Sequence, residues 1–216
     1  MPDLAFAVEN VVADADAAAP LLLLGVRITC ADPAVEVQSV ALRCQVQIEA
    51  TRRRYGPAEQ ARLVDLFGEP DRWSRTLRTL LWTHTSAVVP SFTGSTLVKL
   101  PVPCTFDFNV AATKYFHSLE QGEIPVSLQF SGTIFYAAGD GSLQVAQIPW
   151  DKEATYRLPV AVWHEMMSIF YPNGAWLRLR RDIFERLLEY KAQRGIPTWE
   201  GTIESLLAAS HQQVPS

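Results

Sequence analysis

The feature that most constrains the fold is a change in hydrophobic period roughly two thirds of the way along the chain. Before the change, apolar and polar side chains alternate, and the clearest alternation places five apolar residues on one face of an extended segment: Val40, Leu42, Cys44, Val46 and Ile48. A period of two residues is typical of a strand in an antiparallel sheet with one face in water. The sequence therefore predicts such a sheet, with at least four strands.

Several other segments share this alternation. The full set of predicted strands is 4–8, 22–29, 35–51, 97–102, 104–110, 126–137 and 143–148. Segments 22–29 and 35–51 are the expected partners in a hairpin. The tripeptide Gly139-Asp140-Gly141 is typical of a tight turn, so segments 126–137 and 143–148 are also expected to pair.

Helical spacing interrupts the strands between residues 57 and 81. Pro57 suits a first helical turn. It is followed by apolar residues at helical spacing: Leu63, Val64 and Phe67. A second short helix is expected from Asp71, with its own apolar stripe: Trp73, Leu77, Leu80 and Leu81. Residues 114–122 are expected to form a short link.

The last third of the chain has a helical period. A helix that opens at Pro159 carries a stripe of large side chains: Trp163, Met166, Met167 and Phe170. Asp182 is the expected N-cap of the next helix, with Glu185 three residues later in a capping-box pattern. The apolar stripe of that helix is Ile183, Phe184, Leu187 and Leu188. Thr198 is expected to cap a final helix, and we expect the helices from Pro159 onward to pack on one face of the sheet.

Composition and charge narrow the class of protein. Of the 216 residues, 48% are hydrophobic and 19% are charged, and the net charge is −4. These values exclude extensive disorder and predict no binding to nucleic acid. No linker or repeat divides the chain, so we expect one α+β domain over residues 1–209 and a flexible tail over 210–216. The apolar run 21–25 is too short to span a membrane and no basic leader precedes it, which favours a cytoplasmic protein without membrane insertion.

The sequence contains no recognisable catalytic or metal-binding motif. His164 begins the nearest approach to a zinc-protease helix, but Ser168 stands where the second histidine ligand is required. The three cysteines lack any metal-ligand spacing and are interpreted as small hydrophobic residues of strands: Cys30, Cys44 and Cys104. We therefore expect no enzyme, no cofactor and no tightly bound metal.

Two charged clusters each have two interpretations. Residues 52–54 are three successive arginines, and a solvated strand end is favoured over contact with an acidic partner. Trp150 precedes three charged residues at a strand end, and packing of its ring beneath a loop is favoured over a contact site.

The carboxyl-terminal third resembles the family of the bacterial export chaperone SecB. That family has a proline-opened helix, a short Leu-x-Leu strand and a second helix with an aromatic residue in its first turn. The matching segments here are 158–170, 177–179 and 182–190. Segment 40–46 is similar to the family's Val-x-Leu-Arg-Val-x-Val strand, and 132–135 resembles the Gly-Ile-Phe of its next long strand. The resemblance leaves 53–123 as a large insertion between two strands.

The resemblance implies a SecB-like α+β fold that assembles into a homo-oligomer and binds apolar segments of unfolded or partly folded protein. The chain as a whole also looks like an uncharacterised bacterial family associated with hydrogenase gene clusters. This second likeness implies an assembly factor for hydrogenase maturation, with a hydrogenase subunit as a candidate partner.

A protein-binding site of this kind needs flexible and aromatic apolar side chains at the surface. The candidate residues are Phe135, Tyr136, Trp163, Met166, Met167, Phe170, Tyr171 and Trp176. A second interpretation of the same aromatic side chains is a helix-on-sheet core, and a third is an oligomer interface. The alternative function is a small-molecule-binding or enzymatic domain whose site is assembled from residues distant in the sequence.

Overall fold

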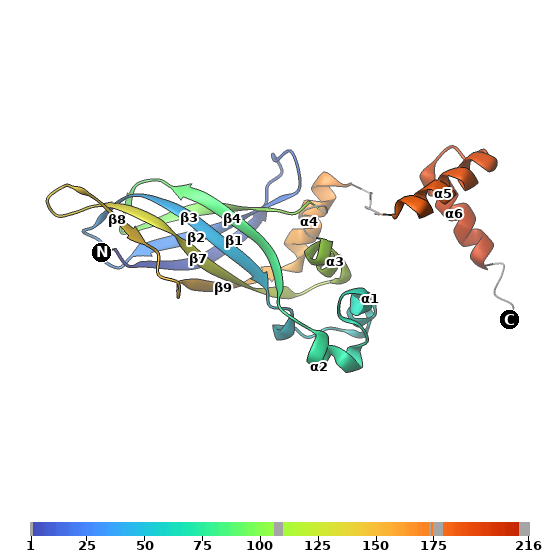
Figure 1. Ribbon diagram of the computed structural model, residues 1–216, viewed down its shortest axis with the longest axis horizontal. Coiled ribbons are helices and arrows are strands. Elements are labelled where there is room, and N and C mark those ends of the chain that lie inside the picture. Colours follow the sequence, from blue (N-terminus) through green and yellow to red (C-terminus); the bar gives the residue numbers. More distant parts are fainter. Residues whose placement is uncertain (1, 106–109, 173, 175–178, 212–216) are drawn as a thin grey trace. The chain divides into compact units, whose positions relative to one another are not determined.

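The computed structural model describes residues 2–105, 110–172, 174 and 179–211 (Figure 1). The chain divides into two compact units, Met1–Gly174 and Ala175–Ser216. The sequence analysis expected one domain over 1–209, and the boundary between the units lies inside that range. Because the two units are separate bodies, each is described by itself.

The first unit contains two antiparallel sheets. One sheet has three strands in the order β1-β2-β6. Its strands are β1 (Leu4–Ala13), β2 (Leu21–Cys30) and β6 (Ser95–Pro103). Alternation in β2 turns four aliphatic side chains inward, and all four are fully buried: Leu22, Leu24, Val26 and Ile28.

The second sheet has six strands, with β4-β3-β7-β8 in order, β5 beside β3 and β9 beside β7. Its strands are β3 (Glu36–Ile48), β4 (Leu80–Val89), β5 (Phe92–Thr93), β7 (Glu123–Ala137), β8 (Leu143–Gln147) and β9 (Glu153–Pro159). The expected pairing of 126–137 with 143–148 is confirmed, because β7 pairs with β8 antiparallel. The antiparallel α+β class is therefore confirmed.

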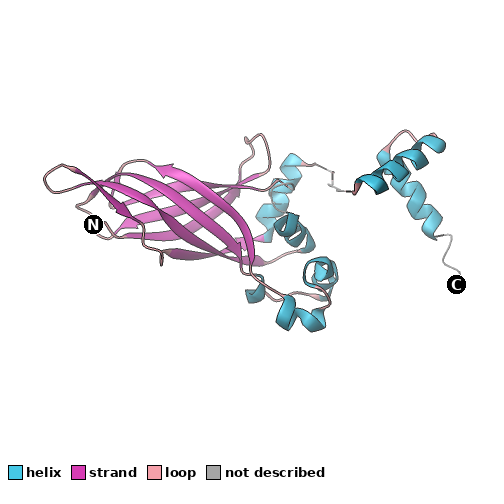
Figure 2. Ribbon diagram, viewed as in Figure 1, coloured by secondary structure: helices cyan, strands magenta, loops and turns pink. Residues whose placement is uncertain are grey.

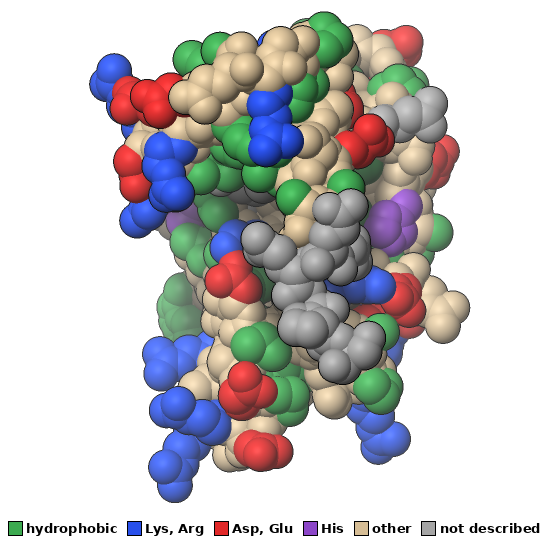
Figure 3. Space-filling model, turned by 90° about the vertical axis from the view of Figure 1, so that its right-hand side faces the viewer, with side chains coloured by type: hydrophobic (Ala, Val, Ile, Leu, Met, Phe, Trp, Pro, Cys, Tyr) green, Lys and Arg blue, Asp and Glu red, His purple; other side chains and the backbone are tan. Residues whose placement is uncertain are grey.

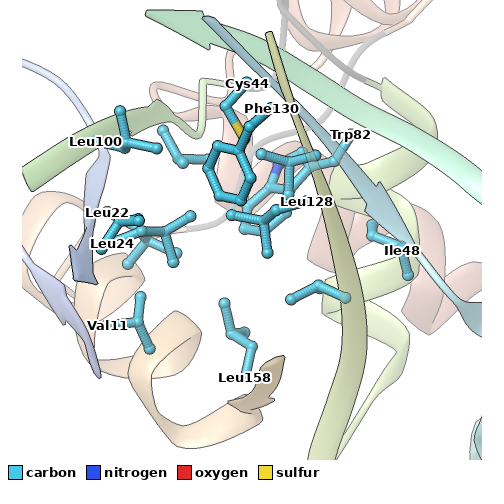
Figure 4. Packing of buried hydrophobic residues seen from close by; sticks show 14 of the residues in the cluster. Val11, Leu22, Leu24, Cys44, Ile48, Trp82, Leu100, Leu128, Phe130 and Leu158 are labelled. Atoms are coloured by element: carbon cyan, nitrogen blue, oxygen red, sulfur yellow. The ribbon is translucent and has the colours of Figure 1, made fainter. Parts of the chain in front are cut away.

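The expected hairpin of 22–29 with 35–51 is wrong, because β2 and β3 belong to different sheets. Each of the two strands has one apolar face to bury. When they lie in opposed sheets, both faces contribute to one core. Figure 4 shows Leu24 and Leu100 of the first sheet pointing toward Leu128 and Phe130 of the second. The five inward residues predicted for the 40–48 segment are all buried.

The three cysteines lie buried as free thiols, as the sequence analysis expected. Burial raises the pKa of the Cys44 thiol to about 12. The thiol therefore stays protonated and behaves as a small apolar side chain.

The segment 53–123, which the resemblance treats as an insertion, contributes β4, β5 and β6 to the two sheets. The helix expected to run from Asp71 to Leu81 is wrong, because α2 covers only Trp73–Thr76 and β4 begins at Leu80. The expected link at 114–122 is also wrong. It overlaps α3 (Val110–Ser118), whose inward face carries three fully buried residues: Ala112, Tyr115 and Phe116. Of the strand expected at 104–110, residues 106–109 lie outside the described residues.

The helices of the first unit gather at one end of its sheets (Figure 2). They are α1 (Pro57–Phe67), α2, α3 and α4 (Val160–Phe170), with two short 3-10 helices at Ala50–Arg52 and Pro70–Arg72. The predicted helix starts at Pro57 and Pro159 are confirmed, with Pro57 as the first residue of α1 and Pro159 as the N-cap of α4. The aromatic side chains of α3 and α4 close this end of the core.

The described part of the second unit, 179–211, contains two helices, α5 (Arg181–Gln193) and α6 (Trp199–His211). The Thr198 cap is confirmed, because its Oγ1 accepts a hydrogen bond from the Gly201 N–H at 3.1 Å. The Asp182 cap is wrong: α5 begins at Arg181, and its N-cap residue Arg180 makes no side-chain capping bond. No described helix is long and apolar enough to cross a membrane.

Candidate binding surfaces

The predicted protein-binding residues divide into three groups. Trp163 and Met166 are buried, and Trp163 is only 1% exposed. The other five described residues are partly buried: Phe135, Tyr136, Met167, Phe170 and Tyr171. Trp176 lies outside the described residues. For Trp163 and Met166, the core interpretation is therefore the right one.

The Trp163 ring helps to close the core at the helical end of the first unit. Its ring stacks on Phe116 of α3, with 4.3 Å between the ring centroids, and Phe116 contacts Trp82 of β4 at 4.8 Å. Three elements far apart in the sequence thus meet in one aromatic cluster. The large side chains of α4 form such a stripe because one face of this helix packs against the core.

Arg53 corrects the interpretation of the arginine cluster at 52–54. Arg52 and Arg54 are exposed as expected, but the Arg53 side chain is 9% exposed and forms a two-pronged ion pair with Glu59. The two N–O distances are 2.8 and 2.9 Å. Arg53 also donates to the backbone carbonyls of Gln121 and Glu123, so it joins the start of α1 to the loop before β7. No pattern in the sequence around Arg53 predicted its pairing with Glu59.

The electrostatics of this pair follow from its partial burial. Burial by itself raises the pKa of the Glu59 carboxyl. Hydrogen bonds from Arg53, from the Glu120 N–H and from the Gly56 N–H, together with the charge of Arg53, outweigh that effect, so the pKa lies below its ordinary value. The carboxylate therefore stays ionised and paired. Its partners all belong to the fold, which assigns the pair a structural role.

Two tyrosines beside this pair share a hydrogen bond. The Tyr55 and Tyr115 hydroxyls lie 2.7 Å apart, and the Tyr55 hydroxyl also donates to the Ala50 carbonyl. Burial raises the pKa of Tyr55 to about 12. Neither phenol is poised to ionise near neutral pH, so the cluster does not offer a catalytic base.

Two histidines lie at the junction of α3 and α4. His164 is hydrogen-bonded through Nε2 to the Leu119 carbonyl at 3.1 Å. Burial lowers the pKa of His117, and the charge of His164 lowers it further. Among the described residues, no group of three or more His, Cys, Asp or Glu side chains is placed to hold a metal ion.

The outer face of the six-stranded sheet carries a shallow groove of about 530 Å³, which we call the sheet groove. It is lined by three residues from each of three strands and by one loop residue: 43–45, 84–86, 129–131 and Trp150. The alternation in β3 predicted that Arg43 and Gln45 face water. Their neighbours on β4 and β7 depend on strand register, which the sequence pattern does not supply.

Trp150 is 93% exposed at the rim of the sheet groove, so its expected packing beneath a loop is wrong. The chain on both sides of it is fixed to β7. The Ile148 N–H donates to the Gly132 carbonyl at 2.9 Å, and the Phe130 N–H donates to the Lys152 carbonyl at 2.8 Å. With both ends of the loop held by β7, the indole is left in solvent.

The second unit carries an apolar surface of a different kind. We call it the hairpin surface and define it by six exposed residues: Phe184, Leu188, Trp199, Ile203, Leu206 and Leu207. Phe184 of α5 meets Trp199 of α6 with 5.2 Å between ring centroids, and the Tyr190 hydroxyl lies 3.0 Å from Ser205 Oγ. No described apolar residue of this unit is buried. Packing of this stripe on the sheet stays a prediction, because sequence periodicity alone does not show what covers it.

Figure 3 shows a face of the protein on which neither sign of charge prevails. Basic and acidic side chains are interspersed on the face shown in Figure 3, with apolar side chains between them. This mixture matches the small net charge of −4. A mixed surface of this kind gives no general electrostatic attraction, so we expect ligand binding to depend on the particular side chains at each site.

Comparison with known proteins gives one match. A family model covers residues 1–215 and is described as a family of unknown function, DUF6084. The match extends over both compact units. No curated protein and no solved structure matches the chain. The resemblance to the export chaperone and the association with hydrogenase clusters stay predictions.

Proposed function

The chain belongs to the DUF6084 family, whose function is unknown, and we propose that it is a protein-binding module of the chaperone or assembly-factor type. The observation that carries the proposal is the hairpin surface, a set of large exposed apolar side chains in a unit where no described apolar residue is buried. The family match includes this unit along with the sheets. The bound segment would therefore be apolar polypeptide, as in an unfolded or partly folded protein.

The size of the second unit explains why its apolar residues need a partner. Its two helices have 13 residues each, and isolated helices of about this length are marginal in water. A unit of roughly 40 residues rarely buries enough surface to be stable unaided. Covering Leu188 and Leu207, which are 47% and 55% exposed, would therefore stabilise both the unit and the complex.

The chemistry of the hairpin surface favours apolar binding over charge pairing. Its two aromatic rings and four aliphatic side chains can cover an apolar segment of varied sequence. Burial of a leucine-sized side chain contributes about 1.5–3 kcal/mol at most. Because that contribution does not depend on ion pairs, we expect the affinity to change little between low and high salt.

The test uses the full chain and a permanently unfolded model protein carrying a fluorescent label. We expect wild-type protein to bind this probe and to suppress its aggregation. The double variant Leu188→Ser, Leu207→Ser should bind at least about tenfold more weakly, since it loses two apolar contacts. Val88→Ser is the matched control, because Val88 is an exposed aliphatic residue on β4, outside the hairpin surface.

Three results would decide against the proposal. The first is a wild-type protein that binds neither unfolded chains nor a purified hydrogenase subunit. The second is a double variant that binds as tightly as the wild type. The third concerns self-association. In sedimentation the wild type would form a homo-oligomer and the double variant would be monomeric, while both bind the probe equally well. That result would assign the hairpin surface to self-association.

A further inference from the structure

The sheet groove lies on the first unit and has no part in the proposed protein binding. Its floor is formed by side chains of the three adjacent strands β4, β3 and β7. In the strand register Gln45 lies between His84 and Gln129, and Arg43 lies between Ser86 and Ser131. Two neighbouring rows of polar side chains therefore cross the sheet.

The first row is ordered by its own hydrogen bonds. His84 Nε2 is bonded to Gln45 Oε1 at 3.0 Å, and Gln45 Nε2 donates to Gln129 Oε1 at 3.4 Å. This chain fixes the two amides but leaves the Gln129 amide N–H groups without a partner among the described residues. Those donors face the solvent over the groove.

The second row presents a guanidinium between two hydroxyls. Among the described residues, Arg43 forms no ion pair or hydrogen bond. No carboxylate of the described residues lines the groove, and Glu153 on β9 lies in register with Gln129. Arg43 therefore offers its forked N–H donors to any ligand oxygen in the groove.

The Trp150 indole adds a flat apolar surface beside these two rows of polar side chains. A large indole left in water is unfavourable, and tryptophan is enriched where a partner covers its ring. Because the two backbone hydrogen bonds to β7 hold its loop, the indole meets a ligand with little loss of backbone freedom. A matching ligand needs one apolar flat face and several hydroxyl or carboxylate oxygens.

We propose that the sheet groove binds a saccharide, with a sugar ring stacked on Trp150 and its oxygens bonded to Arg43 and Gln129. A sugar ring combines an apolar C–H face with a rim of hydroxyls, which is the combination that the groove complements. The volume of about 530 Å³ falls within the range of small-ligand sites. Arg43 accommodates either vicinal hydroxyls or the carboxylate of an acidic sugar.

Two other ligand classes fit less well. An extended peptide binds a sheet through a free strand edge, but the groove lies on the face of the sheet, and among its three strands β4 is the edge strand while both edges of β3 and β7 are paired. A nucleotide phosphate is usually held by free backbone N–H groups or several cations. The groove offers one guanidinium, and the backbone N–H groups of its central strands are used in the ladder.

The experiment probes the full chain with an array of neutral and uronic-acid oligosaccharides, followed by calorimetric titration of the best binder. We expect saturable binding that falls about tenfold or more in Trp150→Ala, since stacking is lost. Arg43→Gln should weaken binding by a similar factor for a neutral saccharide and by more for an acidic one. Leu97→Ala, which removes an exposed aliphatic side chain of β6 in the other sheet, is the control and should bind like the wild type.

The proposal is overturned if no saccharide on the array binds, or if Trp150→Ala keeps full affinity for the best binder. It is also overturned if only unfolded polypeptide, and no saccharide, alters Trp150 fluorescence as judged against the Trp150→Phe variant. Because Trp150→Ala leaves the hairpin surface intact, failure here and failure of the proposed protein binding give different patterns.

Discussion

Two helices of this chain carry similar amphipathic stripes and end in opposite surroundings. In the first unit, α4 buries Trp163 and Met166 in the core that closes the sheets. In the second unit, α5 carries Phe184 and Leu188 on a comparable stripe, yet none of its residues is buried. The contrast shows that an amphipathic pattern identifies which residues cluster on one side, but not what covers them.

The largest effect is expected at the buried ion pair of the first unit. Arg53→Met leaves the Glu59 carboxylate without its partner in a partly buried site, so the free energy of unfolding should fall by about 3–5 kcal/mol. Arg62→Met is the control, because it breaks the Arg62–Glu120 pair, whose side chains are 49% exposed, and should cost less than about 1 kcal/mol. Urea denaturation of both variants measures the difference. Equal losses would mean that the Arg53–Glu59 pair is no more than a surface pair.

The second effect compares the two stripes directly. Met166→Ala removes a fully buried side chain and should lower the free energy of unfolding of the first unit by about 2–5 kcal/mol. Leu188→Ala removes an exposed side chain and should change it by less than about 0.5 kcal/mol. Thermal melts followed by near-ultraviolet circular dichroism report on this unit. A large loss from Leu188→Ala would place that residue in a shared core.

A smaller effect is expected from acid. The pKa of His117 in the folded state lies below its ordinary value of 6.5, so the unfolded chain binds this proton more readily. The contribution of His117 to stability is therefore complete above pH 6.5 and decreases as the pH falls below it. The contribution of Glu59 to stability is also lost on acidification, but only as the pH falls toward and below 4.5, the ordinary pKa of a glutamate.

The pH dependence can therefore be isolated between pH 7.5 and 5. We expect the melting temperature of the wild type to fall across this interval, and the His117→Gln variant to show a smaller fall. A wild-type melting temperature that rises on acidification would contradict the direction of the His117 pKa shift. Because His117 lies on α3 of the first unit, the unfolding transition of that unit should show this pH dependence.

Much of the sheet could be predicted from local patterns. Alternation in β3 placed Val40 to Ile48 correctly, and the Gly139–Gly141 turn placed β7 beside β8. The strand β9 was not predicted although Ala154, Tyr156 and Leu158 alternate with polar neighbours, because the strand is short and ends at Pro159, where the helical period begins. Here the signal was present in the sequence.

The candidate sites depended on information that local patterns lack. The pairing of Arg53 with Glu59 requires a turn between them, and the alignment of Arg43 and Gln45 with His84 requires strand register. The exposure of Trp150 follows from hydrogen bonds made by its neighbours to a distant strand. Each of these features depends on tertiary structure. Periodicity in the sequence indicates only which face of a helix or strand a residue occupies.

The proposed function requires the apolar stripe of the second unit to bind a partner protein and not to form an internal core. Native-state hydrogen exchange of the full chain, followed by mass spectrometry, tests this claim most directly. We expect amides of β3 and β7 to exchange only through global unfolding, and amides of α5 and α6 to exchange much faster until the unfolded probe protein is added. Amides of α5 and α6 that are protected as strongly as those of the sheet, without any partner, would contradict it.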